Sequence, residues 1–199
     1  MTLRKIASGL AIAAAMFSYA ATVSAQEKCD QIVLPDGTLL TCQVDATGQK
    51  VYVDNGGNSY PATTGGVGQF TVVDSDTRPC TAVLDVTTIN LVSNNPKLGT
   101  IKTTLDKTRK SRSSVIRSNQ ESSAFPATED IYFYAIAEVS SLPGQYRSVQ
   151  ELHFNSPKVT SFNPHKNEKF RLVEKVDFVD ANGVVAFTLT QADVSLSGK

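Results

Sequence analysis

Tryptophan is absent from this sequence of 199 residues, and histidine and cysteine are scarce, with two and three copies. Three familiar signatures are missing too: the HExxH of zinc peptidases, the GxSxG of serine hydrolases and the CxxC pair of thiol redox proteins. No glycine-rich stretch is followed by Lys-Ser or Lys-Thr, so a phosphate-binding loop is also lacking. These absences lead us to expect no catalytic residue, no cofactor and no metal site.

Long apolar stretches are missing as well, except at the N-terminus. There Arg4 and Lys5 precede an uncharged run from Ile6 to Val23, and the small residues Ser24 and Ala25 follow it. This order is typical of a cleaved secretion signal over residues 1–25. The alternative, a retained membrane anchor, is disfavoured by the Ser and Gly residues that dilute the run. We therefore expect a mature chain of residues 26–199 that is periplasmic or secreted, with no transmembrane segment after cleavage.

Excess charge of one sign is confined to one segment. Removal of the signal leaves 17 basic and 19 acidic residues, but residues 97–117 contain seven basic side chains and one acid, Asp106. Such a segment is suited to an anionic partner such as a polysaccharide, a nucleic acid or phospholipid head groups. It has no aromatic residue to stack on a base, so we expect no sequence-specific nucleic acid. The alternatives are a solvated loop and docking onto the acidic remainder of the chain. The candidate anion-binding residues are Lys107, Arg109, Lys110 and Arg112.

Three cysteines allow one intramolecular disulfide and leave one thiol. Cys29 and Cys42 are the first candidate pair, because Pro35-Asp36-Gly37 between them predicts a hairpin turn. A two-residue loop places these cysteines opposite each other, whereas a three-residue loop places Cys42 opposite Asp30 instead. A bridge from Cys42 to Cys80 is the rival pairing.

Strand signals dominate the mature chain, and the clearest is a hairpin near the C-terminus. Asn182-Gly183 predicts a two-residue turn that places Phe178 opposite Phe187 and Val176 opposite Leu189. Other predicted strands are an interior strand over 130–139, a long strand over 81–92 with a bulge near Thr87-Thr88, and weaker strands over 50–54, 69–74, 149–155 and 158–162.

About ten short strands predict an all-β fold, an antiparallel β-sandwich of immunoglobulin-like or related type. The Cys…Trp…Cys signature of true immunoglobulin domains is absent. We expect an N-terminal β portion over 26–103 and a C-terminal β portion over 129–199, as one domain or two. Residues 104–128 are rich in Ser and lack alternation, which predicts a basic loop or linker.

Few polar residues stand out as candidates for chemistry. Glu151 and His153 share a face of a predicted strand and could bind a metal or carry a proton, although a surface pair explains them equally. His165 follows a proline in a predicted turn and has no nearby metal-ligand spacing. The acidic turn that begins at Asp54 is compatible with calcium, but an ordinary Asx turn is the simpler interpretation.

The sequence favours a protein that is not an enzyme: an exported β-sandwich that is a binding or structural module of the cell envelope or extracellular space. Its expected partner is a protein or an anionic polymer. Two alternatives remain at this stage. The first is a secreted polysaccharide-active enzyme with paired carboxylates, for example Glu138 or Glu151 with a partner. The second is an anion-binding protein that uses residues 97–117.

Overall fold

The computed structural model describes residues 29, 32–46, 50–76, 80–121, 123–163 and 165–198. The expected signal segment therefore lies outside the described residues. In the described ranges no helix is long and apolar enough to cross a lipid bilayer. The first seven strands are β1 (Leu39–Ala46), β2 (Lys50–Asp54), β3 (Ser59–Asp76), β4 (Thr81–Asn95), β5 (Gly99–Leu105), β6 (Ser114–Gln120) and β7 (Ser123–Phe133). The last seven are β8 (Ala135–Val139), β9 (Gln145–Ser148), β10 (Leu152–Val159), β11 (Glu168–Leu172), β12 (Val176–Val179), β13 (Val185–Gln191) and β14 (Asp193–Gly198).

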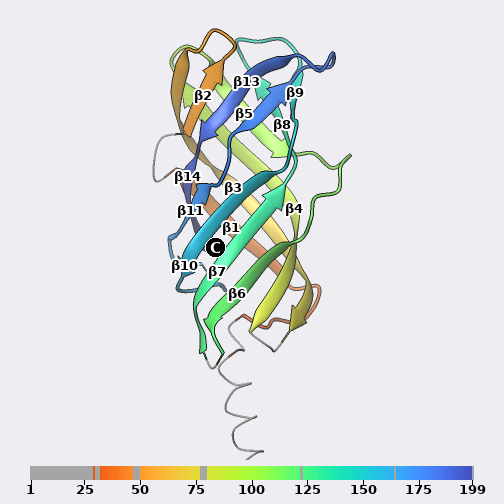
Figure 1. Ribbon diagram of the computed structural model, residues 1–199, viewed down its shortest axis with the longest axis vertical. Helices are drawn as coiled ribbons and strands as arrows, with labels where there is room; N and C mark the ends of the chain where they lie inside the picture. The colour runs from red at the N-terminus through yellow and green to blue at the C-terminus, as the bar shows by residue number, and fades with distance from the viewer. Residues whose placement is uncertain are drawn as a thin grey trace, which may run out of the picture.

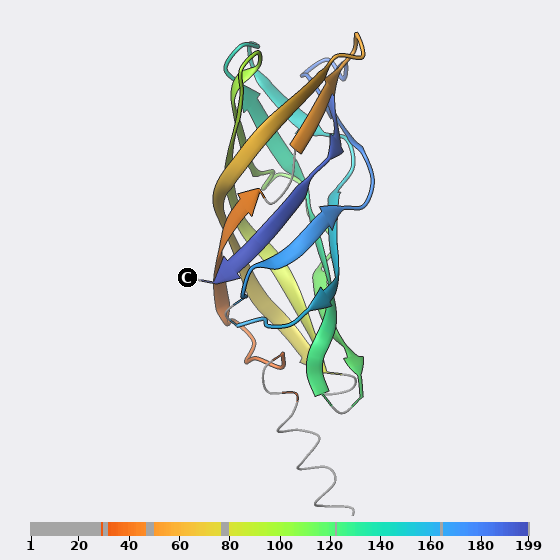
Figure 2. The same ribbon diagram turned by 90° about the vertical axis from the view of Figure 1, so that its left-hand side faces the viewer.

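All of these strands belong to one antiparallel sheet that closes on itself twice. The pairing of β1 with β3 completes a lower ring in the order β1-β14-β11-β10-β7-β6-β4-β3. The pairing of β4 with β5 completes an upper ring in the order β3-β2-β13-β12-β9-β8-β5-β4. The two rings share β3 and β4 and lie end to end along the long axis of the molecule (Figures 1 and 2).

The length of β3 and β4 makes this double closure feasible, with 18 and 15 residues. β3 pairs with β1 over residues 65–71 and with β2 over 59–62. β4 pairs with β6 over residues 81–84 and with β5 over 90–95. Gly66 lies where the partners of β3 change, and a Cβ there would be only 2.1 Å from the carbonyl oxygen of Asn90. Only glycine allows this close approach of the two shared strands.

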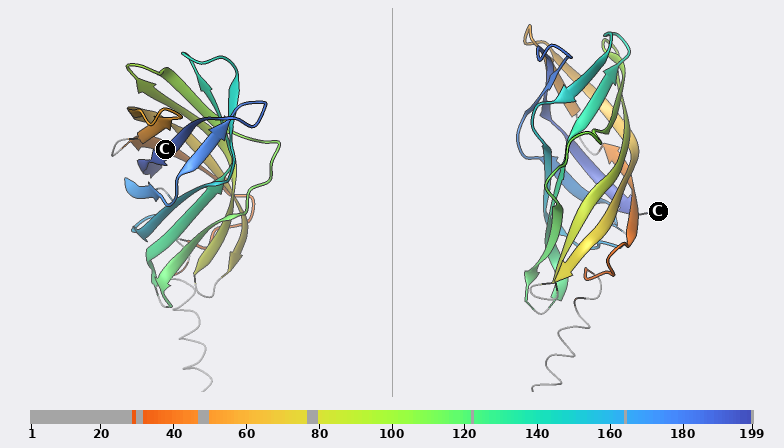
Figure 3. Two further views of the ribbon diagram at one scale, coloured as in Figure 1. Left: turned by 45° about the horizontal axis from the view of Figure 1, so that its top comes forward. Right: turned by 90° about the vertical axis from the view of Figure 1, so that its right-hand side faces the viewer.

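The all-β, antiparallel prediction is confirmed, but the sandwich is not what the structure contains. A sandwich keeps two separately hydrogen-bonded sheets face to face. Here a continuous ladder runs through every described strand, and the views in Figure 3 show the strands wound around the long axis. The N-terminal and C-terminal portions both contribute strands to this one sheet.

Two local predictions are confirmed in their residue pairing. Phe178 pairs with Phe187 and Val176 pairs with Leu189, as predicted. The turn differs from the expected two-residue Asn182-Gly183 loop: the register shifts between Phe178 and Val179, and residues 181–183 lie between Asp180 and Val184, whose amide and carbonyl groups are hydrogen-bonded. In β4 the register shifts between Thr88 and Val86, which places the bulge at Thr87. Turn chemistry and side-chain alternation determine both features locally.

Two segment predictions differ from the structure. Residues 104–128 were expected to form a loop or linker, yet they contain β6 and the start of β7, and the loop is limited to residues 106–113. The expected strand over 130–139 is divided at Tyr134, because β7 belongs to the lower ring and β8 to the upper ring. Short strands with polar outer faces carry too weak a periodic signal to be distinguished from loops.

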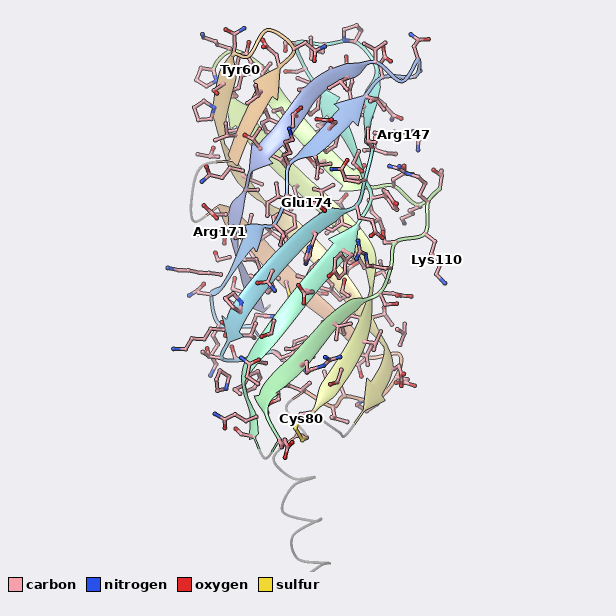
Figure 4. The ribbon with its side chains drawn as sticks, viewed as in Figure 1. Tyr60, Cys80, Lys110, Arg147, Arg171 and Glu174 are labelled. Carbon is pink, nitrogen blue, oxygen red and sulfur yellow. A yellow bond between two sulfur atoms is a disulfide. The ribbon has the colours of Figure 1, made fainter. Side chains whose placement is uncertain are left out.

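The disulfide prediction was wrong, since Cys29 bonds to Cys80 and Cys42 is a free, buried thiol. The expected hairpin over residues 32–40 does not form, because β1 pairs with β3 and β14 instead. Cys42 therefore lies inside the sheet, away from Cys29. The bond closes 51 residues of chain at the lower end of the molecule, where Figure 4 labels Cys80.

Inward-facing side chains fill both rings. The upper ring contains an aromatic cluster around Phe187, whose ring centroid is 5.0 Å from Phe178, 5.5 Å from Tyr146 and 5.6 Å from Tyr52. The lower ring is lined by alternating apolar residues of its eight strands, and a small set of buried polar groups interrupts this lining.

Candidate active site

A buried thiol lies in the wall of the lower ring. Leu40, Cys42 and Val44 alternate with more exposed residues along β1, so their side chains point inward. Cys42 is 2% exposed. Its neighbours across the ladder are Gly68 of β3 and Gly198 of β14, neither of which has a side chain. The sulfur atom is thus surrounded by side chains from elsewhere in the ring.

One of these side chains is the imidazole of His165. This residue lies between β10 and β11, and its Nδ1 is 3.4 Å from Sγ of Cys42. The backbone carbonyl of His165 accepts a hydrogen bond of 2.8 Å from the amide of Gly198, the residue opposite Cys42. Main-chain and side-chain contacts therefore hold the imidazole beside the thiol.

The other ring nitrogen of His165 contacts a carboxylate. Nε2 lies 2.9 Å from Oε2 of Glu129, and both side chains are almost completely buried. Glu129 belongs to β7, where Ala127, Glu129 and Ile131 are buried at alternate positions. Cys42 and His165 are 123 positions apart in the chain, and His165 and Glu129 are 36 positions apart. Their side chains nevertheless form a continuous series of contacts from thiol to imidazole to carboxylate.

Burial and charge act in opposite directions on His165. Burial lowers its pKa because it disfavours the imidazolium, while the Glu129 carboxylate and the contact with Cys42 raise it. Burial is the largest single effect, but the interactions with Glu129 and Cys42 together outweigh it and raise the pKa of His165 to about 10. At neutral pH the ring is therefore protonated on both nitrogens, so it donates one hydrogen bond to Glu129 and one toward the sulfur of Cys42.

The segment that carries His165 is held by a second buried carboxylate. Oε1 of Glu168 accepts hydrogen bonds from the amide and hydroxyl groups of both Thr160 and Ser161, at 2.7 to 3.0 Å. Phe162 and Phe170 pack edge-on against the imidazole, with centroid distances of 5.4 and 6.2 Å. These contacts fix the backbone on both sides of His165 and restrict the orientation of its ring.

The arrangement has the three parts of a nucleophilic centre. A thiol lies beside an imidazole, and a carboxylate on the far nitrogen fixes the orientation of that imidazole. An imidazolium next to a cysteine favours the reactive thiolate. Cys42, His165 and Glu129 are therefore the described residues best arranged for covalent chemistry.

Sequence reasoning missed this centre. It considered Cys42 only for a disulfide, found no role for His165, and did not single out Glu129. No local spacing joins the three residues, because β1, β7 and the segment after β10 meet only when the ring closes. The one available signal was the scarcity of histidine, which leaves two candidates for an acid–base role.

The other histidine lies on the outer surface. Nε2 of His153 is 2.7 Å from Asp130, and its ring stacks on Tyr132 with centroids 4.3 Å apart. The expected partner, Glu151, instead binds the guanidinium group of Arg112 at 2.6 Å. The structure therefore does not pair Glu151 with His153.

The predicted basic segment is partly neutralised by its own chain. Arg109 is 3.2 Å from the buried carboxylate of Asp106 and lies over the ring of Tyr134, 3.9 Å from its centroid. Arg112 lies over Tyr132 while it binds Glu151. These contacts correspond to the docking alternative.

Of the four candidate anion-binding residues, the two lysines, Lys107 and Lys110, are exposed, and Lys110 points away from the body of the molecule in Figure 4. Their contact with an anion stays a prediction.

Asp106 organises this loop. It accepts hydrogen bonds from the amide and hydroxyl groups of Thr108 and lies 2.7 Å from Arg147. Burial raises the pKa of Asp106, but the hydrogen bonds from Thr108 and the guanidinium of Arg147 lower it by more than burial raises it. The resulting pKa is about 2.

The acidic turns are Asx turns. Asp54 accepts hydrogen bonds from Gly56, Asn58 and Tyr60, and Asp180 accepts them from the amides of Asn182 and Val184. Within the described ranges, no three His, Cys, Asp or Glu side chains converge as ligands for a metal ion. The carboxylate oxygens of both turns are therefore occupied by hydrogen bonds from their own loops.

No protein-family model matches this sequence, and no curated protein sequence is similar to it. The fold resembles that of DynF from the dynemicin biosynthesis pathway of Micromonospora chersina. The superposition has a TM-score of 0.72 and covers 84% of this chain and 83% of that chain, at 15% sequence identity. The two proteins therefore share a fold over most of their length.

This likeness contradicts the expectation of a non-catalytic binding or structural module of the cell envelope. That expectation depended on a sandwich architecture and on the absence of catalytic motifs from the sequence. The chain has instead the fold of a protein from a biosynthetic pathway, and its lower ring contains a thiol, an imidazole and a carboxylate in contact.

Proposed function

We propose that this protein is an enzyme of acyl transfer in which Cys42 is the nucleophile. His165 is the general acid and base, and Glu129 orients the imidazole. The observation that carries the proposal is the contact series Cys42–His165–Glu129 inside the lower ring. The likeness to a protein of a biosynthetic pathway is compatible with an enzymatic role, although a shared fold does not assign a reaction.

The proposed reaction has two steps. The sulfur of Cys42, as the thiolate, attacks the carbonyl carbon of a thioester or ester, a carbon–sulfur bond forms, and the bond to the leaving group breaks. The leaving group takes its proton from the imidazolium of His165. Water or another nucleophile then loses a proton to the neutral imidazole of His165 and attacks the thioester on Cys42. This releases the acyl product and regenerates the Cys42 thiolate beside the imidazolium.

Burial of the centre suits this chemistry. Cys42, His165 and Glu129 are each no more than 3% exposed, so the charges that develop at the sulfur are not screened by bulk water. The carboxylate keeps the imidazole protonated and correctly turned, as the acid does in other Cys–His centres.

Turnover of a small acyl thioester tests the proposal. S-acetyl-N-acetylcysteamine is incubated with the folded protein, and the thiol that it releases is measured over time. We expect turnover by the wild type, none by Cys42→Ala, and a rate lower by about 10²–10⁴-fold for His165→Asn. His153→Asn is the matched control and retains the wild-type rate, because His153 lies on the outer surface. Equal rates for His165→Asn and wild type would contradict the proposal.

We also propose that the chain is exported. The charged start, the apolar run and the small residues at 23–25 support this, and the Cys29–Cys80 disulfide suits an oxidising compartment. N-terminal sequencing of protein recovered from a bacterial host with its own signal peptidase tests the idea. A first residue of Gln26 is expected, and a retained Met1 would contradict it.

A further inference from the structure

The immediate surroundings of Cys42 contain a gap in the side-chain lining. Along β1 the inward neighbours of Leu40 and Val44 include Phe70 and Leu196, which fill the ring on either side. At Cys42 both positions across the ladder are glycine. The nucleophile is therefore flanked by two positions from which no side chain projects.

The size and chemistry of this gap can be defined at Gly68. A Cβ added to Gly68 would lie 3.5 Å and 3.6 Å from two ring atoms of Phe70 and 3.6 Å from Cδ1 of Ile89. These are ordinary van der Waals contacts, so the gap accepts about one methyl group before it meets its walls. Both walls are buried and apolar. A charged or long substituent therefore has no complementary surroundings at this position.

We propose that Gly68 is the specificity-determining residue of the Cys42 centre and restricts it to the shortest uncharged acyl groups, such as acetyl. This inference rests on the proposed acyl transfer by Cys42. In the thioester formed on Cys42, the acyl methyl group lies over Gly68 and contacts Phe70 and Ile89. Gly68 itself takes no part in the bonds that form and break, since it acts only by leaving this space unfilled.

Acyl chain length in the wild type is the first test, because it requires no substitution. Acetyl, propionyl and hexanoyl thioesters of N-acetylcysteamine are compared by their initial rates of thiol release. One methylene too many in an apolar pocket reduces the specificity constant by about 10–200-fold. We therefore expect the hexanoyl thioester to react at least about tenfold more slowly than the acetyl thioester. Equal rates for the three thioesters would overturn the inference.

Substitution of Gly68 is the second test, with Gly65→Ala as its matched control. Gly65 lies on the same strand as Gly68 but pairs with Asp45 and not with Cys42. A Cβ at Gly65 would lie 3.9 Å from the nearest atoms of Val44 and Asp45. We expect Gly68→Ala to lower the rate with the acetyl thioester by about tenfold or more, and Gly65→Ala to leave it unchanged. Equal rates for the two variants would overturn the inference.

The outcomes separate this inference from the proposed function. If the wild type releases no thiol from any thioester, or if His165→Asn does not lower the rate, the acyl-transfer proposal itself fails. If turnover depends on Cys42 and His165 but is indifferent to chain length and to Gly68, only the role of Gly68 fails. Equal far-ultraviolet circular dichroism of both glycine variants shows that the comparison is between folded proteins.

Discussion

At the scale of single residues, the electrostatic balance at His165 links the site to the stability of the fold. Its pKa is raised from 6.5 to about 10 in the folded chain, so folding favours the protonated ring. The resulting stabilisation is complete below about pH 6.5, declines as the pH rises further, and is lost above about pH 10. The stability of the protein and the protonation of the proposed acid therefore depend on the same contact with Glu129.

This balance predicts a falling stability at alkaline pH. We expect the free energy of unfolding, measured with urea, to decrease between about pH 7 and about pH 9 by up to about 1.4 kcal/mol per pH unit from this one group. His165→Asn removes this part of the slope, whereas the control His153→Asn retains it. A wild-type slope equal to that of His165→Asn would mean that His165 is not held as an imidazolium.

Asp106 makes the opposite prediction, for acid. Its pKa is lowered to about 2, so its stabilisation is present above about pH 4 and is lost as the pH falls through about 2. Asp106→Asn leaves the buried position with weaker contacts to Arg109 and Arg147, and we expect a loss of about 2–4 kcal/mol near neutral pH. Urea unfolding measures this loss, and Asp85→Asn on the neighbouring strand is the control. A change below about 0.5 kcal/mol would contradict the role of Asp106 as the anchor of the loop.

At the scale of elements, the connection between β10 and β11 determines where His165 lies. Glu168→Ala leaves the amides of Thr160 and Ser161 without their acceptor, which we expect to cost about 2–3 kcal/mol in the free energy of unfolding. Because the connection carries His165, we also expect Glu168→Ala to reduce turnover of the acetyl thioester. The exposed neighbour Lys169→Ala is the control and should change neither quantity. Unchanged turnover in Glu168→Ala would show that the position of His165 does not depend on the hydrogen bonds of Glu168.

Elements were predictable from the sequence where local signals agree. The hairpin of β12 and β13 has its turn residues, its alternation and its aromatic pair in one continuous stretch, so its register could be predicted. The bulge at Thr87 appeared as a change of the buried face within one strand. Residues 32–40 gave an equally good turn signal, but Leu39 and Leu40 pair with β3 instead. A local turn signal cannot reveal a stronger distant partner.

At the scale of the whole molecule, the shared strands β3 and β4 couple the two rings. Closure depends on pairings between segments that are far apart in sequence, such as Cys42 with Gly198, and no periodic pattern encodes such a pairing. The sequence therefore predicted antiparallel β-structure and missed both the rings and the site, because the site exists only once the lower ring has closed. Its residues come from β1, β7 and the connection after β10.

The disulfide acts at the same scale. It closes a loop with a sequence separation of 51 residues, which corresponds to about 4 kcal/mol in the chain-entropy model. We expect the double substitution Cys29→Ser with Cys80→Ser to lower the free energy of unfolding by up to this amount. Cys42→Ser, which affects no disulfide, is the comparison. If the double variant were as stable as the wild type, the bridge would not contribute to folding.

If Cys42 is the nucleophile, a covalent acyl intermediate forms on its sulfur, and that intermediate can be trapped. The folded protein is mixed with acetyl thioester, quenched in acid within the first turnover, and examined by intact and peptide mass spectrometry. We expect one acetyl group per chain, on the peptide that contains Cys42, with slower formation in His165→Asn and none in Cys42→Ala. An unmodified Cys42 peptide in a sample that has released thiol would show that Cys42 is not the nucleophile.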